Sequence, residues 1–257
     1  HISVLNSGGV MMKRYGVVVS LVTFVSCLFG SPGISAIYFD DGLTHNIDYS
    51  TNDVLVDYES PGMGTTVNLL SSGDIMYSFR AYEDSIININ GGSIGERFVA
   101  NGRSQLNMSD GWIGEDLYAL DHSQINMSGG SVGQILYAWD NSHVKITGAS
   151  HTYGLRVGDT AQVIVSGGSF TDNIAGEGGG SFTFVGEDFH IDGHSVPYGE
   201  YPASTYFFGH LTGTLVDGES IDSLFWLNGG ASIFLTPEPA TLILFALGCL
   251  MVRRKRR

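Results

Sequence analysis

The sequence predicts an all-β protein whose central part is a parallel β-helix, or β-solenoid, of about six coils. Residues 66–179 divide into six units of 19 residues without insertion. Apolar residues recur at the third and fifth positions of a unit, which is the alternation of a strand with one buried face. Glycine stands at the eighth position of five units, where the chain must turn sharply. A unit this short buries its apolar side chains only when units stack.

Residues 1–36 are interpreted as an upstream extension followed by a signal peptide. Translation from either of two adjacent methionines would place Lys13 and Arg14 in a basic n-region, followed by the apolar run GVVVSLVTFVSCLF. A small-residue site then predicts cleavage after Ala36. The run is shorter than the roughly 20 apolar residues of a spanning helix. A retained anchor and lipidation at Cys27 are therefore the less favoured alternatives.

The repeat follows a β-rich N-terminal cap, predicted over residues 37–65 from its acidic strands. Within each unit, the third and fifth positions are expected to point into a shared core and the fourth to point outward. Third positions are Asn68, Ile87, Leu106, Ile125, Val144 and Val163; fifth positions are Leu70, Ile89, Met108, Met127, Ile146 and Val165; the middle four units carry Asn88, Asn107, Asn126 and Lys145 at the fourth. Equivalent residues of successive coils would form ladders about 4.8 Å apart.

Residues 180–236 are predicted to form a β-rich C-terminal cap. The segment is rich in aromatic residues and contains two or three strands, with turns at Asp217-Gly218 and Gly229-Gly230. Both caps are expected because open sheet ends expose unpaired backbone groups that template aggregation.

The last segment, residues 237–257, joins three features in a fixed order. Pro237, Glu238 and Pro239 precede an uncharged apolar stretch over 240–252, and five basic residues end the chain. A helix formed by this stretch would insert with its basic end on the cytoplasmic side. Its length is short for a span, although flanking arginines can snorkel. A plain C-terminal membrane anchor is one interpretation of this pattern.

These residues also resemble the PEP-CTERM sorting signal of Gram-negative, exopolysaccharide-producing bacteria. Together with the S-x-[VI]-N-[IM]-S-G-G-S-[IV]-G units and the LTGTLVDG stretch, they resemble a group of uncharacterised PEP-CTERM surface proteins. The resemblance implies recognition by an exosortase, a membrane cysteine protease-transpeptidase, and processing near Pro237 to Pro239. It also implies a transient membrane association through the C-terminal helix.

Charge restricts the partners of the central part. Between Ile37 and Thr236 there are 25 acidic and 5 basic residues, a formal charge of −20. Such a surface repels nucleic acid and anionic lipid, and it favours divalent cations or cationic partners. The two cysteines, Cys27 and Cys249, both lie in the terminal apolar segments, so no structural disulfide is expected in the repeat.

Three aspartates, Asp121, Asp140 and Asp159, share the eighteenth position of a unit and are expected to form a surface ladder. Carboxylates in such a row repel one another unless they bind a cation or extend into water. Solvated turn residues are the favoured interpretation, because Asp is common in turns. A calcium ladder and an acid group like that of β-helix polysaccharide hydrolases are the alternatives.

A carbohydrate-binding face is a further hypothesis. Outward Tyr118, Tyr137 and Trp139 would stack on sugars, and the asparagines of the fourth position would supply donors and acceptors. Asparagine ladders also stabilise solenoids by bonding from coil to coil, and this structural role is favoured.

Taken together, these patterns favour a non-enzymatic structural or interaction protein, exported to the envelope, outer surface or extracellular matrix. We predict no catalytic residue, no metal site and no cofactor apart from the calcium alternative. The expected partners are the exosortase machinery and exopolysaccharide. A polysaccharide-active β-helix enzyme and a carbohydrate-binding module are the competing hypotheses.

Overall fold

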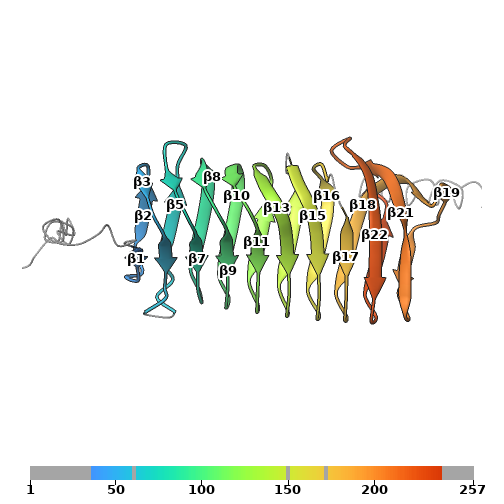
Figure 1. Cartoon of the computed structure of the whole chain (residues 1–257), viewed down its shortest axis with the longest axis horizontal. Coiled ribbons are helices and arrows are strands. Elements are labelled where there is room, and N and C mark those ends of the chain that lie inside the picture. The colour runs from blue at the N-terminus through green and yellow to red at the C-terminus, as the bar shows by residue number, and fades with distance from the viewer. Residues whose placement is uncertain (1–35, 60–61, 149–150, 171–172, 239–257) are drawn as a thin grey trace, which may run out of the picture. The chain divides into compact units, whose positions relative to one another are not determined.

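The structure is a computed structural model that describes residues 36–59, 62–148, 151–170 and 173–238. The predicted terminal apolar helices lie outside these residues. In the described part, regular structure consists of 23 strands, which wind into successive coils (Figure 1). The prediction of an all-β parallel β-solenoid is therefore confirmed.

Each coil passes through three faces, which we call A, B and C. Face A contains, in stacking order, β1 (Ile37–Phe39), β4 (Val54–Val56), β7 (Phe79–Ala81), β9 (Phe98–Ala100), β11 (Leu117–Ala119), the end of β13 (Ser131–Ala138), the end of β15 (His151–Val157), β17 (Ile174–Gly176) and β22 (Ser220–Asn228). Within face A, each of these strands pairs in parallel with its neighbour in the stack.

Face B follows face A along the chain and carries the third, fourth and fifth positions of the repeat. It contains β2 (Thr44–Ile47), β5 (Thr66–Leu69), the start of β8 (Ile86–Ile94), the start of β10 (Gln105–Ile113), β12 (Gln124–Met127), β14 (His143–Thr147), β16 (Gln162–Gly167), the start of β18 (Ser181–Ile191) and β23 (Ser232–Thr236). The short face C is formed by β3 (Ser50–Thr51), β6 (Asp74–Ile75), the ends of β8 and β10, and the starts of β13 and β15.

The predicted shared core lies inside the coils. Ile87, Leu106, Ile125 and Val144 stand in register on face B, and each is at most 2% exposed. Alternation produces this arrangement, because every second side chain of a strand points inward and no single coil can cover it. Larger rings fill the core on face A, where Phe79 stacks on Phe98 with ring centres 5.1 Å apart.

The first repeat unit departs from the predicted frame. Val67 and Leu69, and not Asn68 and Leu70, pair with Ile87 and Ile89 and lie in the core. The corner between β5 and β6 contains one residue more than the equivalent corner of the next coil, so this strand is displaced by one position. A shift of one residue exchanges the inward and outward sides of a strand, and Asn68 consequently points outward.

The stack begins before the predicted repeat. Strands β1, β2 and β3 pair in parallel with β4, β5 and β6, so residues 37–65 form a further coil of the same solenoid. At the other end, β18 leaves the stack and pairs with the antiparallel strand β21 (Tyr206–Leu215), and β22 then returns to face A.

Antiparallel strands close the C-terminal edges of the stack. The outer edge of β22 pairs with β21, and the outer edge of β23 pairs with β20 (Gly199–Pro202), while β19 (His194–Ser195) pairs with the end of β18. The expected turns at Asp217-Gly218 and Gly229-Gly230 lie between β21 and β22 and between β22 and β23. The outer edges of β22 and β23 are therefore not open to pairing with another chain.

Close approach between coils explains the glycine that ends the repeat motif. At the eleventh position of three successive units, a Cβ on Gly95, Gly114 or Gly133 would collide with a carbonyl oxygen of the preceding coil. The glycine at the eighth position has a different role, since Gly111 adopts a φ of 97° that other residues avoid.

Candidate functional site

The outward asparagines of face B form a hydrogen-bonded ladder. Each side-chain Nδ2 donates to the Oδ1 of the asparagine one coil earlier. The ladder runs from Asn126 through Asn107, Asn88 and Asn68 to Asn46, with N···O distances of 3.1, 3.0, 2.9 and 2.8 Å. One donor and one acceptor of most of these amides are therefore used within the protein, which is the structural role that the sequence favoured.

The asparagine ladder borders a shallow groove of about 270 Å³, lined in part by Asn107, Asn126 and Lys145. Lys145 occupies the ladder position in the next coil but is not an amide, so the ladder ends before it. The groove contains no carboxylate, and its lining does not match an acid–base pair.

The aspartates of the eighteenth position are turn residues that bond to the backbone of the preceding coil. Asp121, Asp140 and Asp159 all adopt left-handed backbone conformations, with φ of 56°, 60° and 54°. The carboxylate of Asp159 accepts from the N–H of Asp140 at 3.2 Å, that of Asp140 from Asp121 at 3.0 Å, and that of Asp121 from Gly102 at 3.2 Å. The row therefore satisfies three backbone donors at one corner of the solenoid.

These aspartates are not gathered with further metal-ligating side chains. Within the described residues, no group of three or more His, Cys, Asp or Glu side chains is arranged to hold a metal ion. The geometry assigns the row a role in holding the corners together, and calcium binding stays an untested alternative.

The predicted outward aromatics lie on face A, on a different side of the solenoid from the asparagines. Tyr118 and Tyr137 are in register at the fifteenth position, with ring centres 4.8 Å apart and planes inclined by 4°. The Arg156 guanidinium continues the row and lies 5.6 Å from the centre of the Tyr137 ring, which is cation–π geometry. The hypothesis of one face that combines aromatics with asparagines is therefore wrong.

Tyr118 also bonds to a neighbouring carboxylate. Its hydroxyl donates to Asp116 Oδ2 at 3.0 Å. Burial of the ring disfavours the phenolate, and the hydrogen bond and the negative charge of Asp116 add to this effect. Together they raise the pKa of Tyr118 to about 12.

Further along face A, the surface contains a small hollow. It has a volume of about 140 Å³ and is lined by Trp139, Arg156, Val157, Ala175, Gly176, Glu177 and Trp226. Register explains its position: Arg156, Ala175 and Trp226 occupy the same place in β15, β17 and β22. The small Ala175 between two large neighbours leaves the space open.

Both tryptophans line the hollow. Trp139 leans over the next coil, where its ring packs against Gly158 so closely that any side chain there would collide with it. Trp226 lies in β22 and is 39% exposed, and Tyr206 of β21 stacks against it with ring centres 6.1 Å apart. The sequence indicated Trp139 as an outward aromatic, but it did not place Trp226 beside it.

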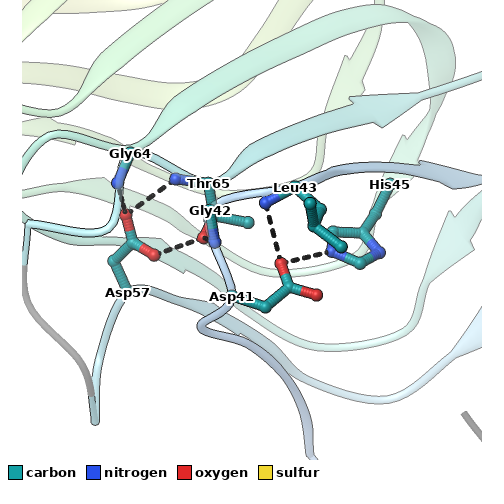
Figure 2. A network of polar contacts seen from close by, with 7 residues as sticks. All are labelled: Asp41, Gly42, Leu43, His45, Asp57, Gly64 and Thr65. Carbon is teal, nitrogen blue, oxygen red and sulfur yellow. Dashed lines mark hydrogen bonds and ion pairs between the residues drawn. The ribbon is translucent and has the colours of Figure 1, made fainter. Parts of the chain in front are cut away.

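The polar network of the first coil has a structural role (Figure 2). Asp57 is fully buried, and its carboxylate accepts hydrogen bonds from the Gly64 N–H, the Thr65 N–H and the Thr65 hydroxyl at 3.0, 3.0 and 2.5 Å. Thr65 Oγ1 in turn accepts from the Gly42 N–H at 2.9 Å. These bonds tie the loop that precedes β5 to the end of β4.

A second carboxylate, Asp41, lies nearby in the same network. Its Oδ1 accepts from the Leu43 N–H at 2.9 Å and bonds to His45 Nε2 at 2.8 Å (Figure 2). Partial burial acts to raise the pKa of Asp41, but the bonds from His45 and Leu43 outweigh it and lower the pKa. Both carboxylates are engaged in holding the chain.

Comparison with known proteins identifies the end of the chain. Residues 235–257 match the model of the PEP-CTERM protein-sorting motif. No curated protein matches the chain, and no solved structure matches it. The motif begins inside β23, where Leu235 is buried and pairs with Phe184. The chain thus carries the sorting signal of an exported protein that exosortase directs to the cell surface.

The predicted processing residues lie at both ends of the described region. Ala36 immediately precedes β1, and Pro237 and Glu238 immediately follow β23, while Pro239 lies outside the described residues. Cleavage after Ala36 and near Pro237 stays a prediction. The described ranges contain no helix that is long and apolar enough to cross a membrane, and the stretch 240–252 falls outside those ranges.

Proposed function

Because the chain ends in a PEP-CTERM sorting motif, we propose that it is a structural protein of the cell surface or the exopolysaccharide matrix. Its function would be to present a stack of coils outside the cell and not to turn over a substrate. One observation carries this proposal. The polar side chains that recur along the stack, the asparagines of face B and the aspartates of the corner, bond from one coil to the next.

The placement of the sorting motif supports the same function. Thr236 is the last residue of β23 and pairs with Val185, and the predicted processing residues follow it directly. Processing near Pro237 would therefore leave the whole solenoid intact and attached through its last strand. A domain delivered in this way arrives outside the cell with all of its coils.

The test is to follow the protein in the cells that make it. We expect mass spectrometry of the wild-type protein from surface and matrix fractions to show that residues before Ile37 and the basic C-terminal tail are both absent. A double variant, Pro237→Ala with Pro239→Ala, should keep its tail and accumulate in the membrane fraction. The control variant Pro197→Ala changes a proline outside the motif and should be sorted normally.

Two results would contradict the proposal. The first is normal tail removal and surface delivery of the double proline variant. The second is turnover of a polysaccharide by the exported protein, measured as release of reducing ends, that is lost in Asp140→Asn. The second result would assign the aspartate row to an enzyme.

A further inference from the structure

We propose that the hollow between Trp139 and Trp226 binds one sugar ring of a neutral polysaccharide, and that the aromatic residues of face A hold the neighbouring rings. This inference deepens the proposed function by naming a partner. It depends on the proposed function in one respect, because only a protein outside the cell would meet such a glycan. The site does not include the asparagine ladder, which lies on face B, or the aspartate row, which lies at the adjoining corner, where Asp140 directly follows Trp139 in the chain.

The size of the hollow fits a six-membered ring. Its volume of about 140 Å³ is close to that of the engineered protein cavity of ~150 Å³ that accepts benzene. Ala175 forms part of the floor. Arg156 and Trp226 rise on either side of it, one coil away in each direction. Two coil spacings place these flanking backbones roughly 9–10 Å apart, which leaves room for one flat group between the side chains.

The lining offers the two kinds of contact that a sugar makes. The C–H faces of a pyranose pack against aromatic rings, and Trp139 and Trp226 provide such rings in the lining. Its hydroxyl groups need donors and acceptors at the edge of the ring. Arg156 provides N–H donors and Glu177 provides carboxylate acceptors at the rim of the hollow. A few polar groups around an apolar lining are typical of sites for small ligands.

Arg156 is available for this role. Its guanidinium lies over the Tyr137 ring. In the part of the chain that the structure describes, its guanidinium has no ion-pair partner. The contact with Tyr137 involves the face of its ring and no hydrogen-bond acceptor, so it leaves the guanidinium N–H groups as donors for a ligand.

The aromatic residues extend beyond the hollow in both directions. Tyr137 and Tyr118 continue the row toward the N-terminal coils, and Tyr206, which is 70% exposed, continues it on β21. Successive coils are about 4.8 Å apart, and a pyranose unit in an extended glycan has a similar length. A polymer lying along face A would therefore meet an aromatic ring or Arg156 at most of its units.

Charge favours a neutral polymer over an acidic one. The region from Ile37 to Thr236 has 25 acidic and 5 basic residues, so a polyuronate would be repelled over its whole length. Arg156 is a single cation beside Glu177, which is too little to offset this field. Sugar recognition at the hollow would therefore depend on stacking and hydroxyl groups.

Tryptophan fluorescence tests the site directly, because two of the three tryptophans of the chain line it. The third, Trp112, lies on face C and is 48% exposed. The exported protein would be titrated with a soluble β-glucan, a galactomannan and amylose, and with alginate and polygalacturonate as acidic probes. We expect at least one neutral probe to change the emission, and the acidic probes to bind at least tenfold more weakly.

Variants separate the hollow from the rest of the surface. Trp226→Ala should weaken binding by about tenfold or more, since truncation of a central tryptophan typically removes much of the binding energy. Ala175→Leu fills the hollow while keeping every aromatic ring, and it should weaken binding to a similar degree. Trp112→Phe, the matched control, should bind as the wild type does. Circular dichroism melting would verify that each variant is folded.

The inference is overturned if no neutral probe changes the emission, if folded Ala175→Leu binds as tightly as the wild type, or if an acidic probe binds best. None of these results depends on where the protein is sorted. If the protein were found not to reach the cell surface, the binding titration would be unchanged. The two proposals can therefore fail separately.

Discussion

At the scale of single residues, the buried carboxylate of Asp57 is the most heavily bonded side chain in the first coil. It accepts three hydrogen bonds from Gly64 and Thr65 and has a left-handed backbone, with φ of 55°. Aspartate and asparagine tolerate this conformation better than other residues with a Cβ. The residue therefore has both a conformational and a bonding role.

Replacement of Asp57 is expected to destabilise the first coil. Asp57→Ala would leave the two buried donors of Thr65 and the partly buried Gly64 N–H without this partner and should lower the free energy of unfolding by about 3 kcal/mol. Asp57→Asn keeps one acceptor oxygen and the left-handed preference, so its loss should be smaller, about 1–2 kcal/mol. Urea denaturation of both variants measures the difference, and equal losses would contradict the hydrogen-bond explanation.

Tyr118 predicts a titration at high pH. Its pKa is raised to about 12 from an ordinary value of 10, first by burial and then by the hydrogen bond to Asp116. Because the folded pKa is the higher one, the stability contributed by this proton is complete below about pH 10 and is lost as the pH rises through about 12. The tyrosinate absorbance of the wild type minus that of Tyr118→Phe should show this late titration. A difference curve centred near 10 would contradict it.

At the scale of elements, the asparagine ladder has a direction that makes a matched test available. Every amide donates toward the N-terminal coil, so Asn46 only accepts, whereas Asn126 donates to Asn107. Asn126→Asp removes a donor and should reduce stability by about 1–2 kcal/mol. Asn46→Asp keeps the acceptor for Asn68 and should change stability by less than about 0.5 kcal/mol. Thermal melting compares the two, and an equal effect would show that added charge is the cause.

Much of this element pattern could be predicted from the sequence. The alternation in units such as SQINMSGGS fixed which residues of β10, β12 and β14 enter the core, because period-two burial leaves little choice. The register of β5 could not be predicted. Gly73 keeps the 19-residue spacing of the eighth position, so the sequence gives no sign that the corner after Leu69 contains one extra residue. A local insertion shifts one strand and leaves the next in place.

The hollow was harder to predict for a different reason. Arg156 and Ala175 follow from the repeat, but Trp226 enters the same row from β22, after the chain has left the stack and returned. The 19-residue spacing does not continue through the segment between β17 and β22. The proximity of Trp139 and Trp226 therefore depends on the tertiary structure, in particular on how β21 and β22 pair.

At the scale of the whole molecule, the excess of acidic residues predicts a dependence on salt. Raising the ionic strength from about 0.01 M to about 0.15 M shortens the screening length from roughly 30 Å to roughly 8 Å and weakens the repulsion among like charges. We expect the melting temperature to rise by about 2–4 °C, which corresponds to ~1 kcal/mol.

Calcium chloride at matched ionic strength separates screening from binding. Because the carboxylates of Asp121, Asp140 and Asp159 already accept backbone hydrogen bonds, we expect no increase in melting temperature beyond that given by sodium chloride. A further increase that a chelator reverses would show that a cation site exists.

The strict register of the middle coils also bears on how such a chain can change its length. Between β8 and β16 each strand of face B pairs in parallel with its counterparts one coil away, so successive junctions repeat one backbone pattern. Duplication or loss of a whole 19-residue unit would leave these junctions intact and move the two ends apart or together by one step. A gain or loss of a single residue within a strand would turn its apolar side toward water. A whole unit is therefore the change of length that this stack accommodates, because it alters the number of coils and leaves the strands at both ends of the stack unchanged.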